Sequence, residues 1–298
     1  MKNTEYLRYK KIIEDHILDF LPEIDHKSIT VYEAMKYSLT AGGKRVRPTL
    51  LLGACEFCGG DISGAIPYAC AIEYIHTYSL IHDDLPAMDD DDMRRGIPSN
   101  HKVYGDAIAI LAGDGLLSSA FEAMSKDMLL YFDEPGYLKK RVRAMHAIAK
   151  GSGCRGMIAG QIADIEAVGK QCSKEMLDFI NLNKTAALIV ASVKAGAHLG
   201  GADEQKLEDL TGYAEHLGLA FQMADDILNI CGNEKTLGKK TGSDSEKHKS
   251  TYPCLYGLDE SKRRLSEHTS AAIDMLSPYF DNAEFFADVA RELALRLN

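Results

Sequence analysis

The sequence predicts an all-α protein, and three observations support this fold class. Apolar residues recur at three- and four-residue spacing in almost every segment. Short stretches with Gly, Pro, Asp or Asn separate these segments, and the alternation typical of strands is nearly absent. The chain has 298 residues, 46% of them hydrophobic and 26% charged, so it can bury a substantial core. Since no disordered linker and no repeat divides the chain, we expect a single domain over residues 1–298, built as a helical bundle.

The apolar spacing predicts a succession of helices. We expect them at residues 3–21, 27–41, 49–59, 62–85, 101–127, 136–150, 153–168, 174–199, 203–232, 259–276 and 281–297. Gly42 and Gly43 favour a left-handed end to the second helix, and Pro48 suits the first position of the next one. Pro86 cannot donate the backbone hydrogen bond that would continue helix 62–85, so this helix ends within an acidic segment.

Charge and cysteine content restrict the partners and the compartment. The formal net charge of −10 argues against nucleic acid or an anionic membrane as the main partner. The N-terminal residues show no secretory signal, and the longest apolar stretch, 107–121, contains Gly113 and Asp114 and is too short to span a bilayer. Seven cysteines, an odd number spread through predicted helices, suit reduced thiols. We therefore expect a cytoplasmic protein without a membrane span.

The segment 81–96 is the most acidic part of the chain. Six aspartates lie within ten residues, and Arg94 and Arg95 follow. Carboxylates this close raise one another's pKa unless cations compensate, and Mg²⁺ commonly combines one or two carboxylates with water and phosphate oxygens. The segment is either a Mg²⁺ site with arginines beside it for phosphate, or an acidic loop exposed to solvent.

A second acidic group favours the metal site. Gln222, Asp225, Asp226 and Asn229 fall on one stripe, about 100° wide, of a single predicted helix. The stripe lies within an apolar segment, where unpaired carboxylates would be unfavourable. We therefore predict that the two acidic segments share one metal cluster.

The break at Pro86 affects the geometry of the first acidic segment. On an intact helix Asp89 would lie about 120° around the axis from Asp83, whereas an interrupted helix lets Asp89 fold back to share an ion with it. His76 lies on the Asp83 face, about 10 Å deeper along the axis. It either faces the same cavity or is a hydrogen-bonded core residue.

Basic residues are concentrated at two further places. Lys44, Arg45 and Arg47 precede a helix N-terminus, which makes an anion cradle, or else they are solvated residues after a helix cap. Lys184 lies in an apolar helix, where it either reaches the surface or points at a buried anion.

The polar segment 231–250 is unusually long for a connection, which indicates a mobile functional loop. Its lysines either close over phosphate or are simply solvated; they are Lys239, Lys240, Lys247 and Lys249.

Together these residues resemble the short-chain trans-isoprenyl diphosphate synthases, closest to the bacterial farnesyl diphosphate synthases (geranyltranstransferases), over nearly the whole chain. The resemblance rests on the order of several blocks, which are far more specific together than singly. They are Gly42-Gly43-Lys44-Arg45-Val46-Arg47-Pro48, His76, Asp83-Asp84-x4-Asp89 with Arg94-Arg95, Lys184-Thr185, and Gln222-x2-Asp225-Asp226. Lys240 and Lys249 match the family's loop lysines.

The resemblance implies a helical bundle around a deep central cavity, of the isoprenoid synthase type, and a homodimer. It implies a transferase that joins isopentenyl diphosphate head-to-tail to dimethylallyl or geranyl diphosphate, with three Mg²⁺ per active site. The metal ligands would be Asp83, Asp89 and Asp225, supported by Asp84 and Asp226. The allylic diphosphate would be held by Arg94, Lys184 and Lys240, and isopentenyl diphosphate by Lys44, Arg47, His76 and Arg95, with Gly43 and Lys249 as further substrate-binding positions.

The resemblance also assigns the chemical step and the product. The carbonyl of Lys184, Thr185 and the amide oxygen of Gln222 would shield the allylic cation. Tyr78 and Ser79 occupy positions where the family limits chain length, so we expect mainly farnesyl diphosphate, with geranyl or geranylgeranyl diphosphate as alternatives.

One position departs from the family pattern. Asn229 stands where the family normally has a third aspartate, which should weaken Mg²⁺ binding on that side because the amide keeps an oxygen but loses the charge.

Three other functions are weaker alternatives. A terpene cyclase would share the cavity and the aspartates, but it would have no use for Lys44, Arg47 and His76. A metal-dependent phosphohydrolase could use His82 and Asp83, but no second histidine pair follows at suitable spacing. A non-catalytic partner subunit would be expected to have lost aspartates or arginines, and only Asn229 points that way.

Overall fold

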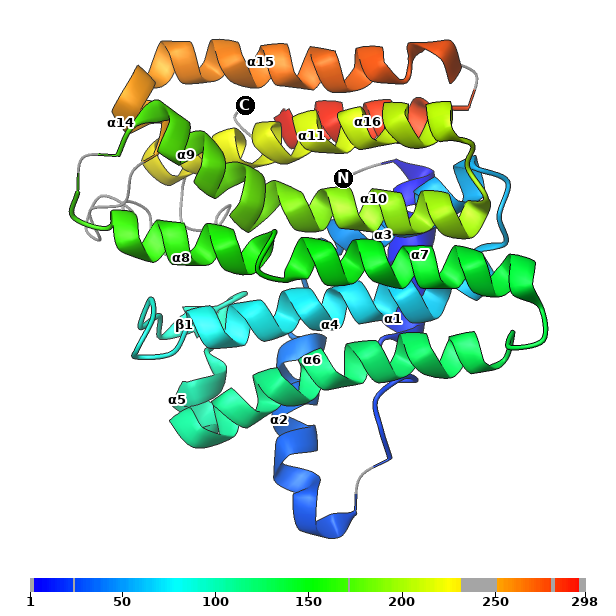
Figure 1. The fold of residues 1–298 in the computed structure, drawn as a ribbon. Helices are drawn as coiled ribbons and strands as arrows, with labels where there is room; N and C mark the ends of the chain where they lie inside the picture. Colours follow the sequence, from blue (N-terminus) through cyan, green and yellow to red (C-terminus); the bar gives the residue numbers. More distant parts are fainter. Residues whose placement is uncertain (1–2, 24, 171, 232–250, 280–281, 295–298) are drawn as a thin grey trace.

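The computed structural model describes residues 3–294 except 24, 171, 232–250 and 280–281, and the side chain of Cys231 lies outside the description too. These residues form a bundle of long helices with very little sheet (Figure 1). The α-helices are α1 (Thr4–His16), α2 (Ile29–Thr40), α3 (Val46–Phe57), α4 (Ile66–Asp83), α5 (Asn100–Tyr104), α6 (Asp106–Leu129), α7 (Pro135–Ser152), α8 (Met157–Ala167), α9 (Lys174–Asn181), α10 (Ala187–Gly200), α11 (Glu204–Cys231), α14 (Tyr252–Tyr256), α15 (Leu258–Met275) and α16 (Glu284–Ala294). Single turns are η1 (His26–Ser28), η2 (Ile62–Ala65), η3 (Leu182–Ala186) and η4 (Ser277–Tyr279), and the strands are β1 (Met93–Arg94) and β2 (Ile97–Pro98).

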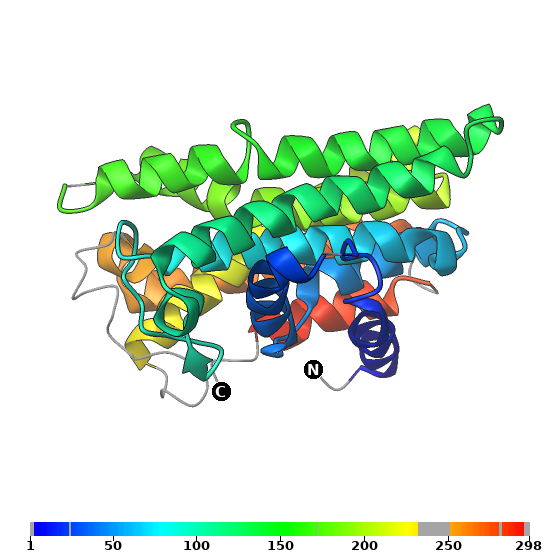
Figure 2. The same ribbon diagram turned by 90° about the horizontal axis from the view of Figure 1, so that it is seen from below.

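Helix α4 forms the centre of the bundle. It contacts α1, α3, α6 and α10, and Figure 2 shows α7 and α8 along one side of it and α1 and α16 along the other. Its side chains are buried around the whole circumference, with Tyr68, Tyr74 and Ile75 fully inaccessible. Since a helix that is apolar on every side is stable only in the interior, α4 carries His76 and Asp83 on a rigid buried element.

Two predicted helices are interrupted in the structure. The predicted helix 101–127 is divided at Gly105, whose φ of 81° ends α5 and begins α6. The predicted helix 174–199 contains η3, a π-helical turn that separates α9 from α10. The apolar residues keep their helical spacing across both breaks, so the periodicity of the sequence did not indicate them.

Other boundaries differ at helix ends. The helix predicted at 49–59 begins at Val46, because Arg45 is its N-cap in the left-handed conformation, so Pro48 is not the first residue. The helix predicted at 3–21 ends at His16, and α14 was not predicted. The remaining helix ends agree with the spacing to within about four residues.

A two-residue hairpin follows the acidic segment. Met93 pairs with Pro98 and Arg94 with Ile97, and the turn residues Arg95 and Gly96 have φ of 53° and 81°. Two central residues with positive φ match the tight turns that suit antiparallel strands. The side chains of Arg94 and Arg95 therefore point in different directions. The strands are too short to show a period in the sequence.

Two helical stretches are long and apolar enough to cross a membrane by length and composition alone, at Asp106–Leu129 and Lys174–Gly200. About half of each apolar window, 44% and 56%, is buried inside the fold. Core helices of globular proteins pass the same test, so the two stretches are weak indicators of a membrane span.

Candidate active site

A cavity of about 420 Å³ lies between α4, α8 and the π turn η3. Its volume is in the range of small-molecule binding sites. Arg47 of α3, His76 and Asp83 of α4, and Lys184 and Thr185 of η3 all line it. Residues predicted from three separate parts of the sequence are thus brought to one cavity.

The chain after α4 folds back on the helix end, as predicted from Pro86. The backbone N–H of Asp89 donates to the carbonyl of Asp83 at 2.8 Å, and that of Asp91 donates to the carbonyl of Asp84 at 3.2 Å. Six residues of chain therefore return Asp89 to the neighbourhood of Asp83, although an intact helix would separate them.

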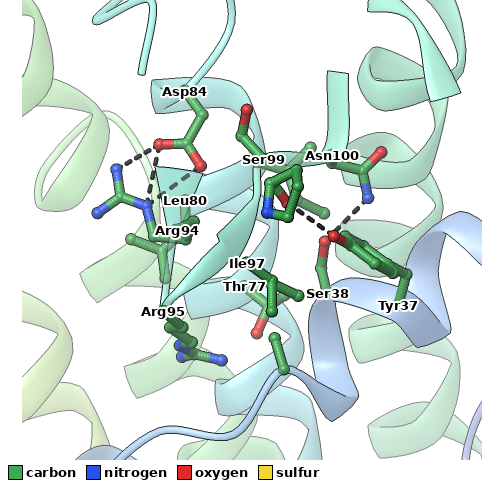
Figure 3. Close-up of a pocket in the computed structure, with 13 residues that line it drawn as sticks. Tyr37, Ser38, Thr77, Leu80, Asp84, Arg94, Arg95, Ile97, Ser99 and Asn100 are labelled. Atoms are coloured by element: carbon green, nitrogen blue, oxygen red, sulfur yellow. Dashed lines mark hydrogen bonds and ion pairs between the residues drawn. The ribbon is translucent and has the colours of Figure 1, made fainter. Parts of the chain in front are cut away.

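Asp84 is buried and is held by Arg94. Asp84 is 2% exposed, and Arg94 Nε lies 2.9 and 3.1 Å from its two carboxylate oxygens (Figure 3). Arg94 Nη2 also bonds Asp84 and lies 3.4 Å from Asp91 Oδ2. This bidentate geometry satisfies both charges within the protein and fixes the hairpin to α4.

The basic wall of the cavity consists of Arg47 and His76, with Arg95 nearby. Arg47 Nη1 lies 3.5 Å from His76 Nε2. Burial lowers the pKa of Arg47 to about 10, and burial followed by the charges of Arg47 and Arg95 holds the pKa of His76 well below its ordinary value. The imidazole of His76 is therefore neutral at pH 7, and it can accept one hydrogen bond while donating another.

Two donors of this wall find no hydrogen-bond partner among the described residues. They are Arg47 Nε and Arg95 Nη1, and both are buried. Unpaired buried donors on cations are unfavourable. The wall is therefore complementary to an anion.

The loop 42–45 packs against this wall. Gly43 has φ of 127°, and a Cβ there would meet Arg95 Cζ at 3.1 Å, so the position favours glycine on two counts. Lys44 is exposed, and its carbonyl accepts a hydrogen bond from the Tyr6 hydroxyl. The prediction that Arg45 belongs to an anion cradle was wrong. Arg45 is 4% exposed and turns into the core instead of toward the cavity.

Two of the three predicted catalytic residues, Thr185 and Gln222, belong to one hydrogen-bonded chain. Thr185 Oγ1 donates to Gln222 Oε1 at 2.7 Å, and Gln222 Nε2 donates to Asp226 Oδ1 at 2.7 Å. The backbone N–H of Tyr252 donates to the second Asp226 oxygen at 3.0 Å. Asp226 is 5% exposed, so its carboxylate orients Gln222 from the side away from solvent.

Lys184 and Asp225 complete the predicted set. Lys184 Nζ lies 2.6 Å from Asp164 Oδ2, and it lines the cavity. Asp225 is on α11, one turn after Gln222. Burial lowers the pKa of Arg47, and the negative charge of Asp225 partly opposes this shift. The second acidic segment therefore lies near the same cavity that Asp83 lines. Asn229, one turn further along α11, is buried at 3% exposure.

The π turn η3 is held close to α8 by a glycine. A Cβ at Gly160 would lie 2.1 Å from the backbone nitrogen of Lys184 and 2.6 Å from its Cα. Only a residue without a side chain allows this approach. Single π turns are frequent at functional sites because they redirect backbone carbonyls, and here the turn contains Lys184 and Thr185.

The end of the cavity next to α4 contains Tyr78, Ser79 and His82. The rings of Tyr78 and His82 meet edge to face at 5.5 Å, and His82 Nε2 lies 3.0 Å from the carbonyl of Ile110. Tyr78 is 8% exposed, so its ring is a fixed part of the wall.

A group of metal-type donors lies just beyond Asp89. Donor atoms of Asp90, Asp92 and His101 all lie within 4.8 Å of one another. Lys102 Nζ already pairs with Asp92 at 2.7 Å. An aspartate-rich group able to hold a metal is thus present, although it differs from the predicted ligands.

The lysines predicted to close over phosphate, including Lys240 and Lys249, lie outside the described residues. Two further features of the site were not predicted from the sequence. Glu73 is 1% exposed and pairs with Arg45 and Arg95, and its position on the His76 face of an apolar helix is the signal that could have indicated it. The apolar wall from α8, with Ile158, Ile162 and Ile165, could not be identified from spacing alone.

Comparison with known proteins identifies the family. The model of the polyprenyl synthetase family matches residues 29–276. The chain belongs to this family. Its helices and its residue blocks are therefore those of a polyprenyl synthetase, and it is a transferase.

Three similar proteins are informative about this polyprenyl synthetase. The farnesyl diphosphate synthase of Geobacillus stearothermophilus is 51% identical over 240 residues, which is 80% of each chain. A heterodimeric geranylgeranyl pyrophosphate synthase large subunit from Arabidopsis thaliana is 47% identical over 83% of this chain and 67% of its own. The crystal structure of an FPP/GFPP synthase from Zymomonas mobilis has a TM-score of 0.85 and 32% identity and covers 98% of both chains.

Proposed function

We propose that this polyprenyl synthetase condenses isopentenyl diphosphate with dimethylallyl or geranyl diphosphate and releases mainly farnesyl diphosphate. The observation that carries the proposal is the lining of one cavity. Arg47 and His76 provide an anion-binding wall on one side, Asp83 lies beside them, and Lys184 and Thr185 lie opposite. A reaction of two diphosphates needs two such anion sites, one of them able to release its diphosphate.

The two diphosphate sites are assigned by their different chemistry. Isopentenyl diphosphate keeps its diphosphate, so a site made of basic and neutral groups suits it, namely Gly43, Lys44, Arg47, His76 and Arg95. The allylic substrate must lose its diphosphate, which suits Arg94, Lys184 and the loop lysines Lys240 and Lys249. Arg94 and Lys184 each pair with an aspartate, Asp84 and Asp164. We propose that both exchange part of these contacts for the substrate.

Mg²⁺ fits the residues at this side of the cavity. Asp83, Asp89 and Asp225 are carboxylates near one cavity, and hard oxygen donors of this kind are the ligands that Mg²⁺ prefers. We assign three ions to these residues, with Asp84 and Asp226 orienting their neighbours from buried positions. Bound Mg²⁺ would stabilise the charge that develops on the leaving diphosphate.

The residues around η3 would shield the allylic cation. The Lys184 carbonyl, Thr185 Oγ1 and Gln222 Oε1 are dipoles held in place by the Thr185–Gln222–Asp226 chain, and fixed dipoles stabilise developing charge without reorganising. The allylic C–O bond breaks, the double bond of isopentenyl diphosphate forms the new C–C bond, and a proton leaves. We assign that proton to the released diphosphate, since no described residue of the catalytic set is an evident base.

The apolar wall supports a prenyl product. Ile158, Ile162 and Ile165 of α8 line the cavity, as do Tyr78 and Ser79 of α4. A bulky Tyr78 beside a small Ser79 is the basis for a fifteen-carbon product. Relatives named for geranylgeranyl products keep the twenty-carbon alternative open, and a ten-carbon product is the other.

The same proposal covers the assembly and the cell compartment. We propose a cytoplasmic homodimer in which each chain is one domain over residues 1–298. The exposed apolar side chains Val103, Ile110 and Leu111 on α5 and α6 support an interface. The reduced thiols expected from the sequence support the compartment.

The test is product analysis of the purified protein with isopentenyl diphosphate, dimethylallyl diphosphate and Mg²⁺. We expect farnesyl diphosphate only when both substrates are present, and no product after chelation by EDTA. Asp83→Asn should lower kcat by about 100-fold or more, whereas the exposed Asp133→Asn should leave it unchanged. Diphosphate release from the allylic substrate alone would instead indicate a cyclase or a hydrolase.

A further inference from the structure

Glu73 is a buried carboxylate that pairs with two arginines, Arg45 and Arg95, beside the basic wall. It is 1% exposed, and its Oε1 lies 2.5 Å from Arg45 Nη1 and 3.3 Å from Arg95 Nη2. Arg45 also donates to the carbonyl of Leu39 at 2.5 Å. The carboxylate thus connects the core arginine of the 42–45 loop to the hairpin arginine.

The position of Arg95 depends on few contacts. Its φ of 53° is a conformation that side chains rarely adopt, and its guanidinium lies against Gly43. One arm of the guanidinium contacts Glu73, while Nη1 has no partner among the described residues. Burial lowers the pKa of Arg95, and the charge of Glu73 opposes this. Without Glu73, two buried guanidinium groups would face each other and repel.

Helix α4 aligns Glu73 with the site. Glu73 lies three residues before His76 and ten before Asp83, so all three fall on one face of the helix. Figure 3 shows Arg94 beside Asp84 and Arg95 at the other end of the hairpin, directed elsewhere. The two neighbouring arginines are therefore oriented by two different acidic residues, Glu73 within α4 and Asp84 at its C-cap.

We infer that Glu73 is a positioning residue that sets the affinity for the homoallylic diphosphate by orienting Arg95. The inference rests on the proposed function, because it takes Arg95 as part of that binding site. Glu73 acts through Arg95 and touches no substrate. Its effect on binding should therefore be confined to isopentenyl diphosphate.

The direction of the change in KM for isopentenyl diphosphate distinguishes a positioning role of Glu73 from a purely electrostatic effect of its charge. A carboxylate near an anion site weakens anion binding by repulsion, so removing its charge alone would lower the KM for isopentenyl diphosphate. Loss of orientation would raise that KM. Glu73→Gln keeps the shape of the side chain but removes both the negative charge and the charge-assisted contact that orients Arg95, so the direction of the KM change shows which effect is larger.

The experiment measures KM for both substrates, kcat and Tm. We expect Glu73→Gln to raise the KM for isopentenyl diphosphate by about 10- to 100-fold, the range of a lost charge-assisted hydrogen bond, with the allylic KM and kcat within about threefold. Asp127→Asn is the matched control, because Asp127 and Arg141 form a similarly buried ion pair at 2.8 Å elsewhere, between α6 and α7. It should lower Tm without changing either KM. An unchanged or lowered KM in Glu73→Gln would overturn the inference.

A double-mutant comparison separates this inference from the proposed function. If Arg95→Gln alone leaves the KM for isopentenyl diphosphate unchanged, the assignment of Arg95 in the proposed function is wrong. If Arg95→Gln raises it, Glu73→Gln should add little in the Arg95→Gln background, because both changes remove one interaction. Additive effects of the two substitutions would contradict the positioning role. Where Glu73→Gln is too unstable to assay, Glu73→Asp, which keeps the charge but shortens the reach, should raise the same KM selectively; unchanged kinetics would contradict the role.

Discussion

Burial decides the charge of the site's histidine. His76 lies beside Arg47, and the surrounding protein together with Arg47 and Arg95 disfavours a third positive charge. An imidazolium would compete with these arginines for the same counter-ions, whereas a neutral ring can donate to a diphosphate without adding to the repulsion. The neutral ring also has a consequence for stability that can be measured.

His76 should make the protein sensitive to mild acid. Its pKa in the folded protein lies well below the ordinary value of about 6.5, so below that pH the unfolded chain binds a proton that the folded protein does not. The free energy of unfolding should therefore fall as the pH drops below about 6.5, and His76 should have no effect above it. We expect His76→Asn to lose a few degrees less of Tm than the parent between pH 7.5 and 5.5. The exposed His26→Asn serves as the control variant, and parallel Tm curves for His76→Asn and the parent would refute the expectation.

Tyr78 should limit product length. Its ring is 8% exposed, packs against His82, and lines the cavity, so Tyr78→Ala opens space next to the growing chain. We expect products longer than fifteen carbons, measured by chromatography after dephosphorylation. Ile75→Ala removes volume from the same helix at a buried position away from the cavity lining, and it should leave product length unchanged. Unchanged products from Tyr78→Ala would remove this residue from the chain-length argument.

At the level of elements, the site depends on a local distortion of one helix. The turn η3 interrupts the α9–α10 helix at Leu182–Ala186 and lets Thr185 reach Gln222 on α11. Such a turn is less stable than regular helix, so neighbouring elements must hold it. Helix α8 does so from one side through Gly160, whose missing side chain leaves room for the backbone of Lys184.

Gly160→Ala should therefore damage both stability and activity. The added methyl group would meet the Lys184 nitrogen at 2.1 Å, and backbone cannot move aside as a flexible side chain can. We expect a loss of about 1–3 kcal/mol in the free energy of unfolding and a kcat lowered by more than tenfold. Gly136→Ala is the control, because a Cβ there meets nothing within 4 Å in the first turn of α7. Equal stability and kcat for the two variants would show that η3 does not depend on this contact.

At the level of the whole molecule, the central position of α4 explains how the site is assembled. One buried helix carries Glu73, His76, Tyr78 and Asp83, and the cavity lies between this helix, α3, α8 and η3. The walls are therefore contributed by elements more than a hundred residues apart, and a change in helix packing would move the diphosphate sites relative to each other.

The assembly is expected to be a homodimer joined through α5 and α6. Val103, Ile110 and Leu111 are 43–53% exposed on these two helices, which contact each other, and exposed apolar side chains commonly mark an interface. Light scattering should give a mass of about 65 kDa, twice the 32.7 kDa of one chain. Leu111→Glu should shift the protein toward monomer, while Met176→Glu on α9, at a similarly exposed position, should not. A monomeric parent protein would contradict the expectation.

Much of the site could be predicted from the sequence because its residues occur in local patterns. The repeated helical spacing indicated the fold class, Pro86 indicated the return of Asp89 to Asp83, and the order of the charged blocks indicated the family that the comparison confirmed. Each of these depends on residues close together in the chain, where backbone geometry follows from residue type.

Only the tertiary structure decided which charged residues face the cavity and which support them from behind. Arg45 and Arg47 are two residues apart, yet Arg45 pairs with Glu73 in the core while Arg47 lines the cavity. Likewise, no local pattern predicts the π turn at Lys184 or its close packing against Gly160. Direction and pairing depend on partners from distant elements, and their free energy comes from desolvation and packing that exist only after the helices have assembled.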